Sequence, residues 1–299
     1  MKQDIFDKLK YIDIKSGVPM SAYTSFKIGG PAYALVEPQT PSMLLKAIAA
    51  ADECGLEYEI IGNGTNLLVS DAGINALVIR VCGTMANISR NGDVFCVGAG
   101  ALMSAFAKNT VEQGYMGLEW AAGIPGTVGG AVAMNAGAYG GEIKHTLCAV
   151  DLIKDGRLVQ VIPVENDMGY RYSVFAAPSS IIVAAYFKLA NDDGNAKERM
   201  DEFTRRRREK QPLQYPSAGS VFKRPDGYFA GALIEQAGLK GANVGDAQVS
   251  EVHAGFIINR GKATCDDVIK LITLVQQRVL AQSGVKLEPE VKLIGDFAT

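Results

Sequence analysis

The sequence predicts an α/β protein that ends in a smaller α+β part, and three observations support this prediction. Strand and helix patterns alternate from the N-terminus to about residue 90. A change in composition follows much later, where residues 191–212 form a highly charged helical segment. Beyond it, strand-like and helix-like segments again take turns. We therefore expect a domain boundary near residue 200.

The first part begins with a strand at residues 33–37 and a helix that Pro41 opens and Gly55 ends. A second strand at 57–61 completes a βαβ unit, so we expect these two strands to form a parallel pair. The elements expected next are a helix at 101–114 and strands at 76–80, 94–100, 148–154, 158–162 and 181–189.

The charged segment is expected to be an exposed helix that ends near Pro212. Its run of basic residues at 205–210 suggests a nucleic-acid patch, but the run is isolated and acidic residues nearby offset it. A solvated linking helix is the simpler interpretation. The last part should contain strands at 220–223, 255–259 and 290–294 and helices at 229–237 and 266–281.

The overall composition restricts the classes of function. The net charge of −2 gives no electrostatic reason to expect nucleic acid or an acidic membrane surface as a partner. Five cysteines without a C-x-x-C spacing indicate reduced thiols, and the first ten residues lack the apolar core of a signal peptide. Neither of the two histidines has a metal-ligand spacing. We expect a cytoplasmic protein, monomeric and without a metal.

The stretch that organises the chain is residues 121–141, which contain no charge and seven glycines. Glycine lets a backbone approach a flat, polar ligand closely. Pro125 suits the first turn of a helix, Gly126 and Thr127 would offer N–H groups to an anion, and Asn135 could bind polar ring edges through its amide. The alternatives are a membrane span, which Pro125 and the polar residues disfavour, and a tightly packed helix without a ligand.

A second glycine-rich turn, residues 62–66, directly follows a predicted strand. It fails the Rossmann fingerprint, because Leu67 occupies the third glycine position and no helix pattern follows. Its successive N–H groups could instead form an anion-binding nest for a pyrophosphate, although a purely structural turn is equally compatible with so short a motif. Two neutral glycine-rich loops together suit one extended dinucleotide.

Three polar residues stand out elsewhere. Arg171 lies among aromatic residues in GYRYS, Ser220 follows a small residue and a glycine in SAGSVFKRP, and Glu290 enters an apolar strand in LEPEV. Each also has a plain structural interpretation: an ion pair, a turn hydroxyl and an exposed strand end. None of the three identifies a function alone.

Taken together, the motifs resemble the UDP-N-acetylenolpyruvoylglucosamine reductase (MurB) family over nearly the whole chain. Seven motifs carry the resemblance in the same order: YTSFKIGGPA, IIGNGTNLLVSD, GLEWAAGIPGTVGGAVAMNAGAYGGE, GYRYS, PSAGSVFKRP, AGALIEQAGLKG and LEPEV. The resemblance implies an FAD-binding fold of the PCMH (vanillyl-alcohol oxidase) type with a C-terminal α+β substrate-binding domain. It also implies non-covalent FAD, NADPH as co-substrate and a UDP-sugar enolpyruvyl ether as substrate. We expect FAD-binding subdomains at 1–83 and 84–200 and a substrate domain at 201–291, with the tail 292–299 as an optional addition to the first subdomain.

The family's chemistry implies roles for three residues. Reduced flavin delivers hydride to C3 of the enolpyruvyl group, and Ser220 matches the family's proton donor to C2. Arg171 matches the arginine that stabilises the developing enolate, and Glu290, when protonated, can donate a hydrogen bond there. Glu288 is the less suitable glutamate of the same motif.

The resemblance also implies binding residues. Expected to bind the cofactor are Gly62, Asn63, Gly64, Thr65, Asn66, Ile124, Pro125, Gly126, Thr127, Gly129, Gly130, Asn135, Gly137, Ala138, Tyr139 and Gly140. Those expected near the UDP moiety are Arg207, Lys210, Lys223 and His253. The chain resembles the shorter branch of the family, which lacks a segment whose tyrosine closes over the nucleotide, so its way of holding UDP is open.

Two rival functions remain at this level. An oxidase of the same FAD fold would pass electrons to oxygen, although many such proteins tether flavin through His or Cys and residues 62–66 contain neither. A non-catalytic flavin-binding or nucleotide-binding module would leave Arg171, Ser220 and Glu290 unexplained.

Overall fold

The computed structural model describes residues 4–177 and 180–297, except for the side chain of Thr84. Residues 1–3 of the predicted first subdomain and residues 298–299 of the predicted tail lie outside the described residues. The chain forms two compact units, each assembled from separate stretches. Unit 1 comprises the chain up to Lys15, Leu35–Asn63 and Leu77–Arg207; unit 2 comprises Ser16–Ala34, Gly64–Ala76 and the chain from Arg208 on. The three-part division predicted from sequence, with limits at residues 83, 200 and 291, stays a prediction.

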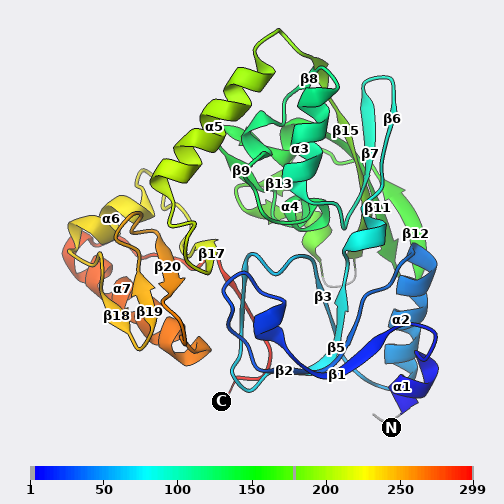
Figure 1. Ribbon diagram of the computed structural model, residues 1–299, viewed down its shortest axis with the longest axis horizontal. Helices are drawn as coiled ribbons and strands as arrows, with labels where there is room; N and C mark the ends of the chain where they lie inside the picture. Colours follow the sequence, from blue (N-terminus) through cyan, green and yellow to red (C-terminus); the bar gives the residue numbers. More distant parts are fainter. Residues whose placement is uncertain (1–3, 178–179, 298–299) are drawn as a thin grey trace. The chain divides into compact units, whose positions relative to one another are not determined.

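The largest sheet lies in unit 1 and contains five antiparallel strands in the order β12-β11-β15-β7-β6 (Figure 1). Helices α3 (Met103–Glu112) and α4 (Val128–Ala133) pack against it. Phe106 of α3 contacts Phe95 and Phe187 of the sheet, at ring-centroid distances of 5.9 and 5.1 Å. The strands are β6 (Ile88–Asn91), β7 (Val94–Gly98), β11 (Leu147–Lys154), β12 (Arg157–Val161) and β15 (Ser180–Lys188).

A second sheet has four strands in the order β1-β2-β5-β3. Its strands are β1 (Ile14–Pro19), β2 (Pro31–Val36), β3 (Tyr58–Ile61) and β5 (Ile74–Arg80). Helix α2 (Pro41–Glu53) connects β2 to β3, and Thr40 caps it by accepting a hydrogen bond from the N–H of Met43 at 3.1 Å. Strands β3 and β5 form a parallel pair, and in the strand order of the sheet β5 lies between β2 and β3. The prediction that β2 and β3 form the parallel pair is therefore wrong.

Several short elements also belong to unit 1. Three two-stranded pairings join β8 to β16, β9 to β10 and β13 to β14. Their bounds are β8 (Tyr115–Met116), β9 (Gly137–Ala138), β10 (Gly141–Glu142), β13 (Met168–Gly169), β14 (Tyr172–Ser173) and β16 (Ala190–Asn191). The remaining helical elements are α1 (Asp4–Lys8), η2 (Gly83–Met85), η3 (Glu119–Ala121), η4 (Ile143–His145), η5 (Val174–Ala176) and α5 (Ala196–Lys210), whose last three residues belong to unit 2.

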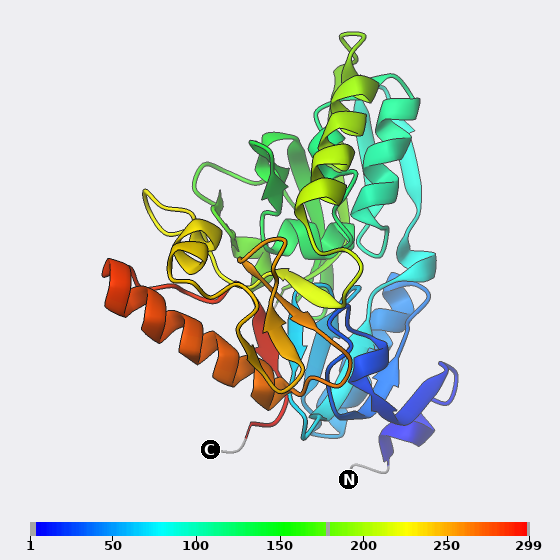
Figure 2. The same ribbon diagram turned by 60° about the vertical axis from the view of Figure 1, so that its left-hand side comes forward.

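Unit 2 contains an antiparallel sheet in the order β17-β20-β19-β18, against which helix α7 (Cys265–Ser283) packs (Figure 2). A parallel pair, β4 and β21, adds the C-terminal strand. The other elements are η1 (Met20–Ala22), β4 (Leu67–Val69), β17 (Ser217–Ser220), α6 (Ala230–Gln236), β18 (Asn243–Val244), β19 (Ala247–Val249), β20 (Phe256–Asn259) and β21 (Lys292–Ile294).

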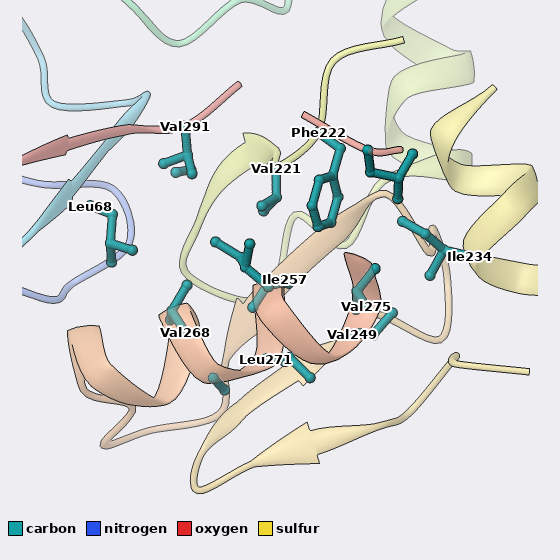
Figure 3. Packing of buried hydrophobic residues seen from close by; sticks show 14 of the residues in the cluster. Leu68, Val221, Phe222, Ile234, Val249, Ile257, Val268, Leu271, Val275 and Val291 are labelled. Carbon is teal, nitrogen blue, oxygen red and sulfur yellow. The ribbon is translucent and has the colours of Figure 1, made fainter. Parts of the chain in front are cut away.

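The core of unit 2 draws on all three of its stretches. Phe26, Ile28 and Leu68 pack in the same buried cluster as the apolar face of α7. Figure 3 shows Leu68 and Val291 beside Val221, with Val268, Leu271 and Val275 of α7 across the cluster. The two short stretches are therefore part of this unit's hydrophobic core and not only connections through it.

Helix α7 has an unusually well-satisfied N-terminus. Thr264 and Asp267 form a capping box, with bonds of 3.1 and 3.0 Å. Asp71 adds its two carboxylate oxygens, which accept from the N–H groups of Cys265 and Asp266 at 2.8 and 3.0 Å. Burial, followed by the nearby carboxylates of Asp71 and Asp266, raises the pKa of the Cys265 thiol to about 12. That thiol stays protonated at neutral pH.

Two further predicted elements differ from the structure. Pro125 precedes the helix instead of occupying its first turn, because α4 begins at Val128 with Thr127 as N-cap. The strand expected at 220–223 ends at Ser220, after which the backbone leaves the regular ladder and Phe222 bridges to Pro289. All five cysteines are free thiols.

Among the described residues, none of the helices combines the length and the apolarity that crossing a membrane requires.

Candidate active site

The glycine-rich turn at residues 62–66 leads from β3 into β4 and contacts the longer glycine-rich segment, residues 121–141, which is called the second glycine-rich segment below. A Cβ on Gly62 would stand 2.4 Å from Thr127 Oγ1, so this position requires glycine. Asn63 Nδ2 donates a hydrogen bond to the carbonyl of Pro125 at 3.1 Å. These contacts, both within unit 1, bring together the two segments that the sequence suggested would serve one ligand.

The turn continues into unit 2, where Gly64 has φ +62° and a Cβ would lie 2.1 Å from the carbonyl oxygen of Tyr23. In the part of the chain that the structure describes, no backbone N–H of residues 62–66 donates a hydrogen bond to the protein. The same holds for Gly126 and Thr127. Backbone donors left open in this way suit an anionic ligand such as a pyrophosphate.

A charged network positions Asn63. Arg80 donates from Nη2 to Asn63 Oδ1 at 3.3 Å and from Nη1 to Glu37 Oε1 at 2.5 Å. Glu37 also accepts from Cys82 Sγ at 3.4 Å and from Lys15 Nζ at 3.3 Å. Burial opposes the ionised form of Glu37, but the hydrogen bonds from Arg80, Cys82 and Lys15 outweigh it and lower the pKa of the carboxyl. The network therefore holds an ionised carboxylate behind the glycine-rich turn.

Sequence reasoning missed Glu37 and Arg80. Both stand at the carboxyl ends of strands, Glu37 after β2 and Arg80 at the end of β5, while Asn63 follows β3. Carboxyl ends of parallel strands meet at one edge of a sheet, which is where α/β proteins commonly bind ligands. A polar residue at the end of each strand was the available signal.

Asn135 is completely buried and connects three segments of unit 1. Its Nδ2 donates to Glu142 Oε2 at 2.7 Å and to the carbonyl of Gly169 at 2.8 Å, while Oδ1 accepts from the N–H of Lys144 at 3.0 Å. Its φ of +43° is one that asparagine tolerates better than most residues. Protein groups take both donor hydrogens of this amide, while its role as a cofactor-binding residue stays a prediction. Asn135 ties the glycine-rich segment to the loop that carries Arg171.

Arg171 lies in that loop with an unusual backbone conformation, φ +53°. Its Nη2 donates to the carbonyl of Gly137 at 3.3 Å, and its guanidinium carbon is 5.1 Å from the ring centroid of Tyr170. Strained backbone at a half-buried arginine is common at functional sites. The structure therefore places Arg171 beside the predicted cofactor-binding residues of unit 1.

Helix α5 contacts the second glycine-rich segment through one stripe of residues four apart. Arg199 pairs with the buried Glu119 at 2.7 Å, and the Phe203 ring stacks on Tyr139 at 4.7 Å and 9°. Arg207 follows, and a Cβ on Gly123 would lie 2.6 Å from its Cδ. Burial lowers the pKa of Arg207. Arg207, expected near UDP, thus lies beside the predicted cofactor-binding segment, and the role of Phe203 escaped sequence reasoning because the helix is so highly charged.

Ser220 and Glu290 stand on neighbouring segments of unit 2. The N–H of Glu290 donates to the carbonyl of Val221 at 2.7 Å, and Ser220 Oγ donates to the carbonyl of Phe222 at 3.1 Å. Asn66, the last residue of the glycine-rich turn, donates from Nδ2 to the carbonyl of Glu290 at 3.1 Å. The end of that turn and the two candidate catalytic residues are therefore linked within this unit.

The remaining candidates are also in unit 2. Lys223 Nζ lies 3.4 Å from Glu288 Oε2, and Lys210 is exposed at the end of α5. The ring of His253 packs edge-on against Phe256 at 5.0 Å, and its Nδ1 accepts from the N–H of Gly255 at 3.1 Å. Burial lowers the pKa of His253, which favours the neutral imidazole. No group of three or more His, Cys, Asp or Glu among the described residues could hold a metal ion.

The backbone N–H groups and the glycine-rich surroundings of the two segments have the chemistry that binding FAD requires. Within unit 1, the N–H groups of residues 62, 63, 126 and 127, which donate to no described protein group, suit its pyrophosphate, and the neutral, glycine-rich surroundings suit a flat ring system. Arg171, half-buried and bonded to the carbonyl of Gly137, adds a fixed positive charge in unit 1.

Comparisons with known proteins agree with this geometry. Residues 32–161 match the FAD binding domain family, and residues 211–294 match the C-terminal domain of UDP-N-acetylenolpyruvoylglucosamine reductase. The chain is 47% identical to the UDP-N-acetylenolpyruvoylglucosamine reductase of Agathobacter rectalis, over 99% of this chain and 98% of that protein. It is 44% identical to the enzyme of that name from Caldanaerobacter subterraneus, over 99% and 100% of the two chains.

A solved structure agrees as well. The crystal structure of UDP-N-acetylenolpyruvylglucosamine reductase (MurB) from Thermus caldophilus superposes with a TM-score of 0.82 at 37% identity, covering 94% of this chain and 99% of that one. The fold is therefore an FAD-binding domain followed by a MurB-type C-terminal domain. From its sequence, its fold and these relatives, the chain belongs to the UDP-N-acetylenolpyruvoylglucosamine reductase family.

Proposed function

We propose that this chain reduces the enolpyruvyl ether of UDP-N-acetylglucosamine to UDP-N-acetylmuramate with NADPH, using non-covalently bound FAD. This is a step of peptidoglycan precursor synthesis, which we assign to a cytoplasmic monomer. The observation that carries the proposal is the link from the glycine-rich turn to both candidate catalytic residues of unit 2. Asn66 donates to the carbonyl of Glu290, and the N–H of Glu290 donates to the carbonyl of Val221, next to Ser220.

When bound, FAD supplies hydride transfer, taking a hydride from NADPH and passing it to C3 of the enolpyruvyl group. The glycine-rich segments would hold it through the N–H groups of residues 62–66 and 126–127, with Asn63 keeping the two segments together. Gly129, Gly130, Gly137, Ala138 and Gly140 would provide close backbone approach, and Tyr139, stacked on Phe203, an aromatic wall.

The chain's own residues would handle the charge and the proton. As hydride reaches C3, negative charge develops on the substrate carboxylate, and Arg171 and protonated Glu290 stabilise it. Ser220 then gives its proton to C2 and recovers one from solvent. Its hydroxyl donates to the carbonyl of Phe222 at 3.1 Å, so it must rotate away from that acceptor to reach C2. Lys210, Lys223, His253 and Arg207 are proposed to serve the UDP end.

The test is a visible spectrum of the purified protein, followed by NADPH oxidation with and without the enolpyruvyl sugar nucleotide. We expect a flavin spectrum, release of all the colour as FAD on acid precipitation, and NADPH consumption that depends on the sugar nucleotide. Rapid reoxidation by oxygen without substrate reduction would instead indicate an oxidase. A flavin spectrum without any NADPH consumption would indicate a non-catalytic binding module.

A further inference from the structure

Two adjacent aromatic side chains are exposed in unit 2, just before helix α6. Tyr228 is 48% exposed and Phe229 is 63% exposed. Helix α6 buries Ala230, Leu233 and Ile234 in the core, so its apolar face is already covered without Phe229. A phenylalanine this exposed gains nothing from the core, and exposed aromatic surface of this kind commonly marks a binding site.

The local backbone conformation keeps the side chains of Tyr228 and Phe229 at the surface. The N–H of Tyr228 donates to the carbonyl of Pro225 at 3.1 Å, which closes a turn with Gly227 at φ +74°. Phe229 then stands in an extended conformation as N-cap residue of α6, with φ −119° and ψ 120°. The ring is therefore presented by a closed turn on one side and a helix on the other.

Arg224 covers one face of the exposed ring. Its guanidinium carbon lies 4.1 Å from the ring centroid of Phe229, and its Nε donates to the carbonyl of Tyr228 at 3.4 Å. A guanidinium stacked in this way restrains the ring and adds a cation–π contact. A ring held from one face and largely exposed can receive a second flat group on the other.

The order of residues along this segment matches the order of parts in a nucleotide sugar. Ser220, the candidate proton donor, comes first, the cations Lys223 and Arg224 follow, and Phe229 comes last. A uridine diphosphate sugar likewise has its sugar at one end, two phosphates in the middle and a flat base at the other end. Cations that stand between these two residues in the chain, one of them in contact with the ring, suit the diphosphate.

We propose that Phe229, backed by Arg224, is the stacking platform for the uracil base of the substrate. The assignment rests on the proposed function, because it takes the uridine diphosphate sugar as the ligand. It gives the base a stacked position and the diphosphate a neighbouring pair of cations, all within residues 223–229. Aromatic stacking also explains why a ring that the core does not use remains on the surface.

The experiment measures binding of UDP, and separately of inorganic pyrophosphate, to the FAD-loaded protein by isothermal titration calorimetry. Phe229→Ala should weaken UDP about 5- to 140-fold, the range expected when one stacked base loses its aromatic partner. It should leave pyrophosphate affinity unchanged, whereas Arg224→Ala should weaken both ligands. Phe229→Trp should retain UDP affinity, and Leu280→Ala, which removes a 48% exposed leucine of α7, should change neither.

Several outcomes would overturn the proposal. An unchanged UDP affinity in Phe229→Ala, with normal substrate turnover, refutes the stacking and leaves the proposed function intact. An equal loss of UDP and pyrophosphate affinity shows a general disturbance of the segment and also refutes it. Unchanged UDP binding together with a shift in sedimentation shows that the aromatic pair covers a protein interface instead. A wild-type protein that binds UDP but consumes no NADPH with the enolpyruvyl sugar nucleotide refutes the proposed function alone.

Discussion

The candidate residues of the two units differ in how the protein holds them. In unit 1, Asn135 is fully buried with three hydrogen bonds, and Asn63 is fixed by Arg80 and by the carbonyl of Pro125. In unit 2, Phe229 and Lys223 present their side chains to solvent, and Ser220 Oγ bonds to the carbonyl of Phe222, two residues further along the chain. The candidate residues of unit 1 are thus fixed by protein contacts, whereas those of unit 2 are held by fewer of them. Substitution of Asn63 or Asn135 should therefore reduce stability. Substitution of Ser220, Lys223 or Phe229 should reduce turnover without unfolding the protein.

The largest effect should come from Ser220→Ala, which sharpens this contrast. Reduction of the flavin by NADPH should stay nearly intact, whereas its reoxidation by the enolpyruvyl substrate should slow about 10²–10⁴-fold, the usual contribution of a general acid. The melting temperature should not change, because among the described residues Ser220 Oγ donates to a single carbonyl, that of Phe222. Stopped-flow absorbance of each half-reaction measures this. Slower NADPH reduction with normal substrate turnover would contradict the assigned role.

Arg171→Ala should have the next largest effect and tests whether a unit 1 residue can act on turnover alone. Loss of the cation should slow the substrate half-reaction about 10²–10³-fold, as removal of one charge-stabilising donor does elsewhere. Arg171→Lys, which keeps the charge but not the planar fork, should recover part of the rate. The readout is again stopped-flow absorbance. If both variants reoxidised at the wild-type rate, Arg171 would be a structural residue only.

Asn135 offers the strongest test of a prearranged cofactor side. Asn135→Ala should destabilise the protein by about 2–4 kcal/mol, because it removes the three hydrogen bonds of a fully buried amide and forces alanine to a positive φ. Asn135→Gly loses the same hydrogen bonds but accepts that φ, so it should be about 1 kcal/mol more stable than the alanine variant. The midpoint of urea unfolding and the affinity for FAD should decrease together in both variants. Equal stabilities of the two variants would show that the backbone conformation contributes nothing.

Asp71 extends the same test to unit 2, at a place remote in sequence from its candidate catalytic residues. Asp71→Ala removes both acceptors from the N-terminus of α7 and should lower stability by about 1–2 kcal/mol without changing either half-reaction. Asp266→Asn is the matched control. It removes an exposed carboxylate paired with Lys270 at 2.5 Å, and exposed pairs of this kind contribute little, so its effect should be much smaller than that of Asp71→Ala. Equal melting temperatures for the two variants would contradict this role of Asp71.

The smallest expected effect concerns pH and the charged network behind the glycine-rich turn. The pKa of Glu37 is lowered in the folded protein from its ordinary value of 4.5. Its contribution to stability is therefore complete above that ordinary value and is lost as the pH falls below it. The difference in urea midpoint between wild type and Glu37→Gln should be present at pH 7 and shrink at pH 4. Exposed Glu57→Gln should show no such difference, and a constant Glu37 difference across this range would argue against an ionised network.

The sequence predicted elements with strong local signals and missed those that depend on distant partners. Helices α2, α3 and α7 have clear periodicity and end signals, and they were predicted within a few residues. The position of β5 between β2 and β3 could not be read from the chain, because strand order depends on pairing between residues far apart.

The candidate site shows the same division. The glycine-rich segments and the residues Arg171, Ser220 and Glu290 were found from motifs, which are local. The hydrogen bonds from the Asn135 amide to protein groups include one to a carbonyl 34 residues away, which the local sequence does not reveal. The stacking of Phe203 on Tyr139 involves a helix whose charged sequence suggests full exposure to solvent. Burial of a polar side chain is a property of the assembled fold.

The interleaving of the two units along the chain has a consequence for how the gene can be divided. The polypeptide passes from one unit to the other at residues 15, 34, 63, 76 and 207, and one of these passages falls inside the glycine-rich turn. A recombination event that exchanged everything after residue 207 would transfer α7 without Phe26, Ile28 and Leu68, which pack in the same core. Each half can therefore be inherited, expressed or exchanged intact only together with the other.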